Sequence, residues 1–180
     1  TSMQTSRGCP FPCAFYCPYP LVQGTRWRAR SAEHVVAEIE EIVQKYKVRK
    51  ILFRDATFTL DRKRTERICN LIFEKGLNIT WWCETRLNCI DPDLLQLMKL
   101  AGLQGMNVGV ETGDPQVMKD HAKAGVTMEQ VISIRKTAKK LGVRLHFLLM
   151  TGLPEESKSS LFETFKLVHT VKPDSIGVTI

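Results

Sequence analysis

The sequence predicts an α/β fold built from parallel β-strands, and three observations lead to this prediction. Short runs rich in β-branched and aromatic residues alternate with longer runs in which apolar residues recur every three or four positions. Capping residues and glycines separate many of these runs. No glycine-rich phosphate loop joins a strand to a helix, which argues against the nucleotide-binding open sheets. Such alternation requires parallel strands with right-handed crossovers, in either an open doubly wound sheet or a barrel.

Six strands and five complete helices follow from these runs in order. The strands are expected at 2–6, where only the tail of a first strand is present, and at 50–55, 79–84, 105–111, 143–150 and 175–180. The helices are expected at 33–46, at 65–75, between the Asp91–Pro92 cap and Gly102, between the Thr127 cap and Gly142, and at 161–171. Thr127 and Gln130 have the spacing of a capping box.

Composition and charge are those of an ordinary globular domain. The chain has 180 residues, of which 43% are apolar and 25% charged. No run approaches the roughly 20 apolar residues of a membrane span, and no secretory signal is present, so we expect a cytoplasmic protein with no membrane partner. The net charge of +7 would suit a nucleic acid. However, the basic residues are spread along the chain and solvated helix faces explain them equally well, so nucleic-acid binding is the minor interpretation.

Three cysteines in the stretch RGCPFPCAFYCP carry the strongest chemical signal. Cys9, Cys13 and Cys17 are interleaved with prolines, which disfavour a helix and predict a loop that wraps around a ligand. A structural zinc site needs four ligands, and no fourth one lies nearby in the sequence. Three thiolates on a four-iron cluster would leave one iron open for chemistry. Incidental thiols, or one disulfide and one free thiol, remain the alternative.

The cysteine loop resembles the cluster-binding motif of the radical S-adenosylmethionine (radical SAM) family. The family's usual spacing is C-x3-C-x2-C, and this chain has C-x3-C-x3-C, which is one residue longer. The segments GVETG and TGLPEE also resemble family motifs, and the resemblance covers nearly the whole chain. It implies a partial (β/α)6 TIM-type barrel, with a 4Fe-4S cluster on Cys9, Cys13 and Cys17. It also implies SAM at the open iron and reductive cleavage of SAM to a 5′-deoxyadenosyl radical that abstracts hydrogen from the substrate.

Further site residues are expected where the strands end, because ligands of parallel α/β folds bind at the carboxyl ends of the strands. Under the resemblance, Asp55 meets the SAM amino group, Arg86 its carboxylate, and Glu111 with Thr112 its ribose. Backbone groups from Met150 to Gly152 meet the adenine. The aromatic residues of the loop, Phe15 and Tyr16 among them, shield the cluster and flank the adenine. His146, on the strand that ends at Met150, is more simply explained as a core residue.

The chain most resembles radical SAM enzymes that carry a cobalamin-binding domain, many of them methyltransferases. This resemblance rests on the order of four segments: RWRARSAEHVVAEIE, RDATFT, GVETG and GLPEE. The chain has no Asp-x-His-x-x-Gly cobalamin signature, so such a domain would lie outside it. We therefore expect residues 1–180 to be one radical SAM core domain, cut from a longer chain, with a ferredoxin or flavodoxin as reductant. A tRNA methylthiotransferase-like enzyme and a noncatalytic iron–sulfur or zinc-binding barrel remain alternatives. The sequence does not identify the substrate.

Overall fold

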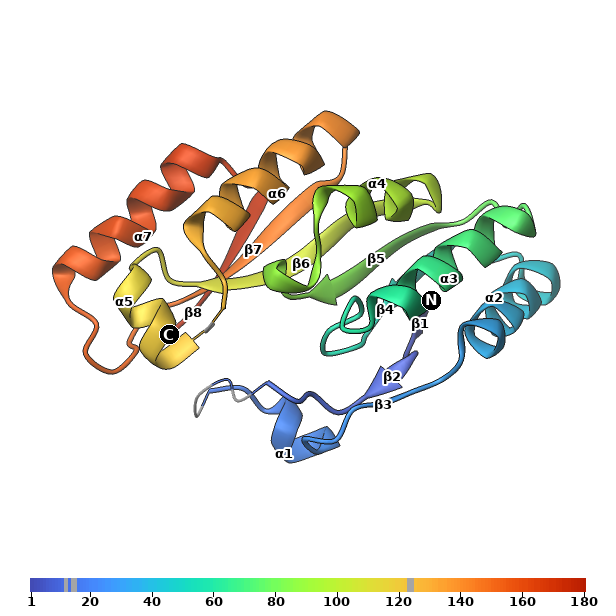
Figure 1. The fold of residues 1–180 in the computed structure, drawn as a ribbon, viewed down its shortest axis with the longest axis horizontal. Coiled ribbons are helices and arrows are strands. Elements are labelled where there is room, and N and C mark those ends of the chain that lie inside the picture. The colour runs from blue at the N-terminus through green and yellow to red at the C-terminus, as the bar shows by residue number, and fades with distance from the viewer. Residues whose placement is uncertain (12, 14–15, 123–124) are drawn as a thin grey trace.

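In the computed structural model of the chain, the predicted strands form one six-stranded parallel sheet (Figure 1). The structure describes residues 1–11, 13, 16–122 and 125–180. The strand order is β1-β4-β5-β6-β7-β8, and every neighbouring pair is parallel. These strands are β1 (Ser2–Met3), β4 (Lys50–Phe53), β5 (Thr80–Thr85), β6 (Leu103–Glu111), β7 (Arg144–Met150) and β8 (Ser175–Thr179). The α/β prediction is confirmed.

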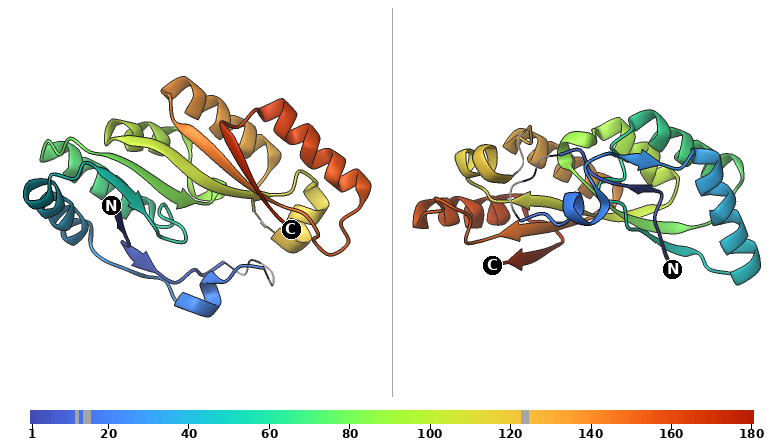
Figure 2. Two further views of the ribbon diagram at one scale, coloured as in Figure 1. Left: turned by 180° about the vertical axis from the view of Figure 1, so that it is seen from behind. Right: turned by 90° about the horizontal axis from the view of Figure 1, so that it is seen from below.

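Five longer helices connect these strands and lie on one side of the sheet (Figures 1 and 2). They are α2 (Ala32–Tyr46), α3 (Arg62–Glu74), α4 (Pro92–Leu100), α6 (Met128–Leu141) and α7 (Lys158–Val171). The cysteine loop lies on the opposite side of the sheet from these helices (Figure 1). The sheet curves between the two layers, as expected for a partial barrel. Among the described residues, no helix has the length and apolar character that crossing a membrane requires.

The hydrophobic core fills the space between the sheet and the helices. Phe53, Phe58 and Trp81 are fully buried there, with ring centroids 4.7 to 5.4 Å apart. Burying each such side chain contributes about 1.5–3 kcal/mol. Along β7, Leu145, Phe147 and Leu149 are buried, whereas the alternate residues are partly or largely exposed. The alternate residues therefore face the inside of the partial barrel.

The helix starts are set by side-chain caps, two of which the sequence predicted. Asp91 accepts a hydrogen bond from the Leu94 N–H, and Thr127 forms a capping box with Gln130. Two other helices start earlier than expected, because the caps Asp61 and Ser157 precede first turns made only of polar residues. An apolar stripe cannot reveal a polar first turn.

The first expected strand, 2–6, is divided in the structure. Its beginning is β1, which pairs with β4, and its end is β2 (Ser6–Arg7), which leaves the sheet and pairs antiparallel with β3 (Arg28–Ala29). The two strands β2 and β3 form the neck of the cysteine loop. Other short elements were not predicted: α1 (Tyr19–Gln23), η1 (Leu87–Cys89), α5 (Pro115–Val117) and η2 (Met118–Ala122), a π-helical turn.

Candidate functional site

A cavity of about 300 Å³ opens at the carboxyl ends of the strands, beneath the cysteine loop. A volume of this size lies at the lower end of the range for small-ligand pockets. From the loop it is lined by Cys9, Cys13, Tyr16, Cys17 and Tyr19, and from the strand ends by residues that include Glu84, Arg86, Asn107, Gly109, Glu111, Met150 and Thr179. The fold thus brings all three cysteines together with three of the strand-end residues expected from the sequence: Arg86, Glu111 and Met150.

The donors around this cavity fit an iron–sulfur cluster. No disulfide joins any of the six cysteines, all of which belong to the described residues, so the loop sulfurs stay available as ligands. The Arg86 guanidinium donates to the Cys13 sulfur at 3.0 Å and stacks on the Phe11 ring, 4.0 Å from its centroid. Cysteine binds iron as its thiolate, and the Arg86 guanidinium places a positive charge beside the sulfur of one expected ligand. Among the described residues no three His, Cys, Asp or Glu side chains gather around one point as ligands of a single ion would.

Glu111 is placed in the cavity by a local distortion of β6. The register between β6 and β7 shifts between Gly109 and Glu111, and Glu111 has a left-handed backbone with a φ of 66°. A non-glycine residue in this conformation costs about 1 kcal/mol or more, and such strain is concentrated at functional sites. Glu111 is 7% exposed and lines the cavity. The strand end is therefore built to hold a buried acid beneath the cysteine loop.

Tyr16, one of the three residues between Cys13 and Cys17, lines the same cavity as Glu111. Burial raises the pKa of the Tyr16 phenol well above its usual value, and the charge of Glu111 raises it further. The phenol is therefore protonated at neutral pH. Phe15, its predicted companion, lies outside the described residues.

Tyr19 and Glu84 also line the cavity, although neither was expected as a ligand residue from the sequence. The Tyr19 hydroxyl donates to Glu84 Oε2 at 2.9 Å, while Arg54 donates to Glu84 Oε1 at 3.0 Å. Burial and the Glu84 carboxylate raise the pKa of Tyr19 to about 12. The contact fastens helix α1 to the end of β5. Glu84 could have been predicted as a site residue because it is an acid at the end of a strand. Nothing in the sequence around Tyr19 indicates its role, because its partner is 65 residues away.

Two expected ligand residues, Thr112 and Gly152, are outside the cavity lining. The Thr112 hydroxyl is fully buried, 3.2 Å from the Thr164 hydroxyl, and accepts the Asp114 N–H at 3.1 Å. Gly152 has a φ of 83° and donates its N–H to Glu156 Oε2 at 2.7 Å. Both residues shape the loops that follow β6 and β7.

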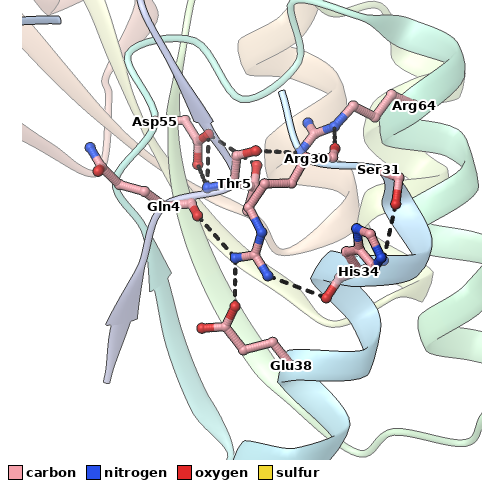
Figure 3. A network of polar contacts seen from close by, with 8 residues as sticks. All are labelled: Gln4, Thr5, Arg30, Ser31, His34, Glu38, Asp55 and Arg64. Carbon is pink, nitrogen blue, oxygen red and sulfur yellow. Dashed lines mark hydrogen bonds and ion pairs between the residues drawn. The ribbon is translucent and has the colours of Figure 1, made fainter. Parts of the chain in front are cut away.

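The structure does not bring Asp55 to the cavity either. Asp55 is 0% exposed, and its carboxylate accepts the Thr5 N–H at 3.1 and 3.2 Å, the Thr5 hydroxyl at 2.9 Å and the Ser6 hydroxyl at 2.5 Å (Figure 3 shows the Thr5 contacts). These donors belong to the neck of the cysteine loop. In the structure the Asp55 carboxylate anchors this neck, and the expected contact between Asp55 and the SAM amino group stays a prediction.

Arg64 of α3 holds the same neck from its other side (Figure 3). Its Nε donates to the Arg30 carbonyl at 2.7 Å and its Nη2 to the Thr5 carbonyl at 2.9 Å. The Arg30 N–H also donates to the Thr5 carbonyl, at 3.0 Å. Burial lowers the pKa of Arg64, and the nearby Asp55 charge opposes this effect. We call Thr5, Arg30, Asp55 and Arg64 the neck clamp, because together they tie the entry of the loop to its exit.

The family model of the Radical SAM superfamily matches residues 3–168. The chain therefore belongs to the Radical SAM superfamily. The predictions of the family and of the partial barrel are confirmed, and membership implies a 4Fe-4S cluster and SAM as the cofactors of this domain.

Relatives and solved structures agree with this assignment. The chain is 35% identical, over 178 residues, to an uncharacterized methyltransferase of Pyrococcus horikoshii, a match that covers 99% of the chain and 38% of the relative. It is 30% identical to an anaerobic magnesium-protoporphyrin IX monomethyl ester cyclase of Rubrivivax gelatinosus, covering 94% of the chain and 30% of the relative. The chain thus spans well under half of these relatives.

Among solved structures, the fold is similar to the radical SAM methyltransferase TsrM from Kitasatospora setae, determined with cobalamin and a 4Fe-4S cluster bound. The TM-score is 0.90 at 19% identity, and the match covers 99% of this chain and 33% of TsrM. This similarity establishes the fold.

Proposed function

We propose that this chain is the catalytic core of a cobalamin-dependent radical SAM methyltransferase and forms one domain of a longer protein. The observation that carries the proposal is the convergence of Cys9, Cys13 and Cys17 with Glu111 and Arg86 on one cavity at the strand ends. When bound, the cluster and SAM supply reductive cleavage of SAM and hydrogen abstraction from the substrate, chemistry that belongs to the cofactors. The chain's own residues bind, orient and shield these groups.

The three cysteine sulfurs would hold the cluster, each through its thiolate. Arg86, fixed beside Cys13 and over Phe11, places a positive charge against the sulfur and towards the cavity. That charge offsets the negative charge of the thiolates and would suit a carboxylate ligand as well.

Glu111 is the residue suited to bind ribose hydroxyls, because a buried carboxylate gains most by accepting two O–H donors. Tyr16 would keep its proton and donate a hydrogen bond within the same cavity. The backbone next to Met150 would meet the adenine edge. Thr112 and Gly152 would support these contacts by holding the loops after β6 and β7.

The methyltransferase assignment is supported by the names of the relatives and by the cobalamin in the TsrM structure. The cobalamin would be bound by a part of the protein outside this chain. A second candidate is a methylthiotransferase, favoured by 24% identity over 192 residues to a putative methylthiotransferase of Methanocaldococcus jannaschii. For either enzyme we propose a cytoplasmic location, since reduced thiols persist there, and a ferredoxin or flavodoxin as reductant.

The test uses the full-length protein, reconstituted anaerobically with iron and sulfide and supplied with SAM, cobalamin and a reductant. We expect about four irons per cluster site, formation of 5′-deoxyadenosine and, for a methyltransferase, S-adenosylhomocysteine. Replacing Cys9, Cys13 and Cys17 by alanine should remove the iron, whereas the matched variant Cys69→Ala should keep it. Tight uptake of one zinc with no iron would instead support the noncatalytic barrel.

A further inference from the structure

The segment that forms the cysteine loop and its neck carries positive charge and has no acidic residue in its sequence. Residues 1–32 contain four arginines and neither Asp nor Glu. Arg30 is turned to α2 and forms an ion pair with Glu38 at 2.5 Å. The other three, Arg7, Arg26 and Arg28, are exposed at the neck of the loop. This part of the surface therefore attracts anions.

These arginines are held close together by the neck itself. Arg7 and Arg28 are opposite each other in the antiparallel pair of β2 and β3. The Arg28 guanidinium donates to the Arg26 carbonyl at 2.9 Å and to the Gln23 carbonyl at 3.1 Å. The second contact ties the arginine cluster to the end of helix α1.

Helix α1 adds two aliphatic side chains to the same surface. Leu21 is 87% exposed and Val22 is 79% exposed, while Tyr19 of the same helix is fastened to Glu84 in the cavity. The helix thus turns its polar anchor inward and its aliphatic residues outward. An exposed apolar contact with a charged rim is typical of protein–protein interfaces. We call Arg7, Leu21, Val22, Arg26 and Arg28 the loop face.

The loop face is joined to the cysteine loop by hydrogen bonds. The Cys9 N–H donates to the Gly24 carbonyl at 3.1 Å, and the Gly8 N–H donates to Gln23 Oε1 at 3.2 Å. One hydrogen bond therefore connects the backbone of Cys9 to the segment between α1 and Arg26. An electron carrier at this surface would contact a segment that is hydrogen-bonded to a proposed cluster ligand.

We propose that the loop face is the docking surface for a small acidic electron-carrier protein. Acidic groups of the carrier pair with the three arginines, and an apolar patch around its redox centre covers Leu21 and Val22. One electron leaves the reduced centre of the carrier and enters the oxidised cluster, and no proton or chemical group is exchanged. The inference rests on the proposed function in one respect, since it requires a cluster that must be reduced.

An RNA phosphate backbone is the other anion that arginines bind. The loop face favours a protein instead, because two almost fully exposed aliphatic side chains gain nothing against phosphates but are buried well by a protein partner. An interface of this kind is small and transient, and its association rate falls as salt is added.

The experiment uses the full-length, cluster-loaded protein and reduced flavodoxin as the carrier. Flavodoxin has no iron, so freeze-quenched electron paramagnetic resonance follows the protein's own cluster as it is reduced. The double variant Arg7→Glu with Arg26→Glu reverses two of the three positive charges, and Leu21→Gln with Val22→Gln removes the apolar contact. The matched control, Lys139→Glu with Lys140→Glu on α6, changes the net charge equally at an exposed site.

At low salt, we expect flavodoxin to reduce the cluster of the arginine variant about tenfold more slowly than that of the parent, or slower still. The aliphatic variant should show a smaller decrease in this rate. The control should stay within about twofold of the parent. Dithionite, which needs no docking surface, should reduce all of them alike. Wild-type rates with flavodoxin in both loop-face variants would overturn the proposal. A protein that takes up no cluster would refute the proposed function, while flavodoxin binding to the apo-protein would still test the surface.

Discussion

The Asp55 carboxylate and the Thr5 backbone N–H are 3.1 Å apart in the interior of the protein, where Asp55 has no exposure to solvent. This contact joins the end of β4 to the neck of the cysteine loop across 50 residues of sequence. Arg64 completes it from α3 by donating to the Thr5 carbonyl. The position of the three cysteines therefore depends on a buried charged group that contacts none of them directly.

Replacing Asp55 by alanine should both destabilise the protein and loosen the loop. It removes the acceptor for three neck donors and the charge next to Arg64, which together should cost about 3–5 kcal/mol in unfolding free energy. Asp55→Asn retains an acceptor and should cost less. Urea unfolding measures stability, and iron content after reconstitution measures the loop. Asp174→Asn, at an acid partly exposed between β7 and β8, is the matched control.

The opposite outcome would assign Asp55 to SAM. In that case Asp55→Ala would keep its iron and most of its stability, and only the response of the cluster spectrum to SAM would be lost.

A methyl group should be much more disruptive at Gly8 than at Gly24. The two have similar φ values, 85° and 81°, so alanine is strained at both by about 1–3 kcal/mol. A Cβ on Gly8 would lie 2.1 Å from the Arg26 carbonyl oxygen and would force β2 and β3 apart. At Gly24 the nearest atom is the tip of Arg28, 3.9 Å away. We expect Gly8→Ala to lose most cluster uptake and Gly24→Ala to keep it, measured as bound iron. Equal uptake by both would show that the neck can open without consequence.

The thiols should separate into two classes in the apo-protein. Burial raises the pKa of Cys69 to about 12 and that of Cys83 well above its usual value, so neither forms thiolate at about pH 8. Cys13 and Cys17 are half-buried in the loop and should react with a maleimide first. Peptide mapping by mass spectrometry identifies the labelled residues, and cluster loading should protect both. Labelling of Cys69 as fast as Cys13 in the folded protein would contradict the described packing.

The Tyr19–Glu84 hydrogen bond should weaken in alkaline solution. The folded protein raises the pKa of Tyr19 to about 12 from the value of 10 for an unperturbed tyrosine, so folding favours the protonated phenol. Its contribution to stability is therefore complete below pH 10 and is lost as the pH rises from 10 towards 12. Tyrosinate absorbance should show a group that titrates near pH 12 and that Tyr19→Phe removes, whereas Tyr16 titrates later still. If Tyr19→Phe instead removed a group that titrates near pH 10, Tyr19 would lie in water.

The sequence was sufficient to predict the structural features that repeat along the chain or that have a local sequence pattern. Apolar periodicity identified the six strands and five helices, and short motifs identified the cysteines, Arg86, Glu111 and Met150, which all line one cavity. The strand ends were a reliable guide, because parallel strands bring them to a common edge.

What could not be predicted depends on contacts between distant segments. Asp55 ends a strand as a ligand residue would, yet a two-residue departure of β2 from the sheet gives it the neck donors as partners. Tyr19 and Arg64 likewise have partners 65 and 59 residues away. Sequence spacing contains no information about such pairs.

The central claim is that Cys9, Cys13 and Cys17 hold one cluster whose open iron receives SAM, despite the extra residue between the last two cysteines. Electron paramagnetic resonance of the reconstituted, reduced protein with and without SAM tests it most directly. We predict the spectrum of one reduced four-iron cluster, changed in shape when SAM is added. A reduced cluster whose spectrum is identical with and without SAM would contradict the claim.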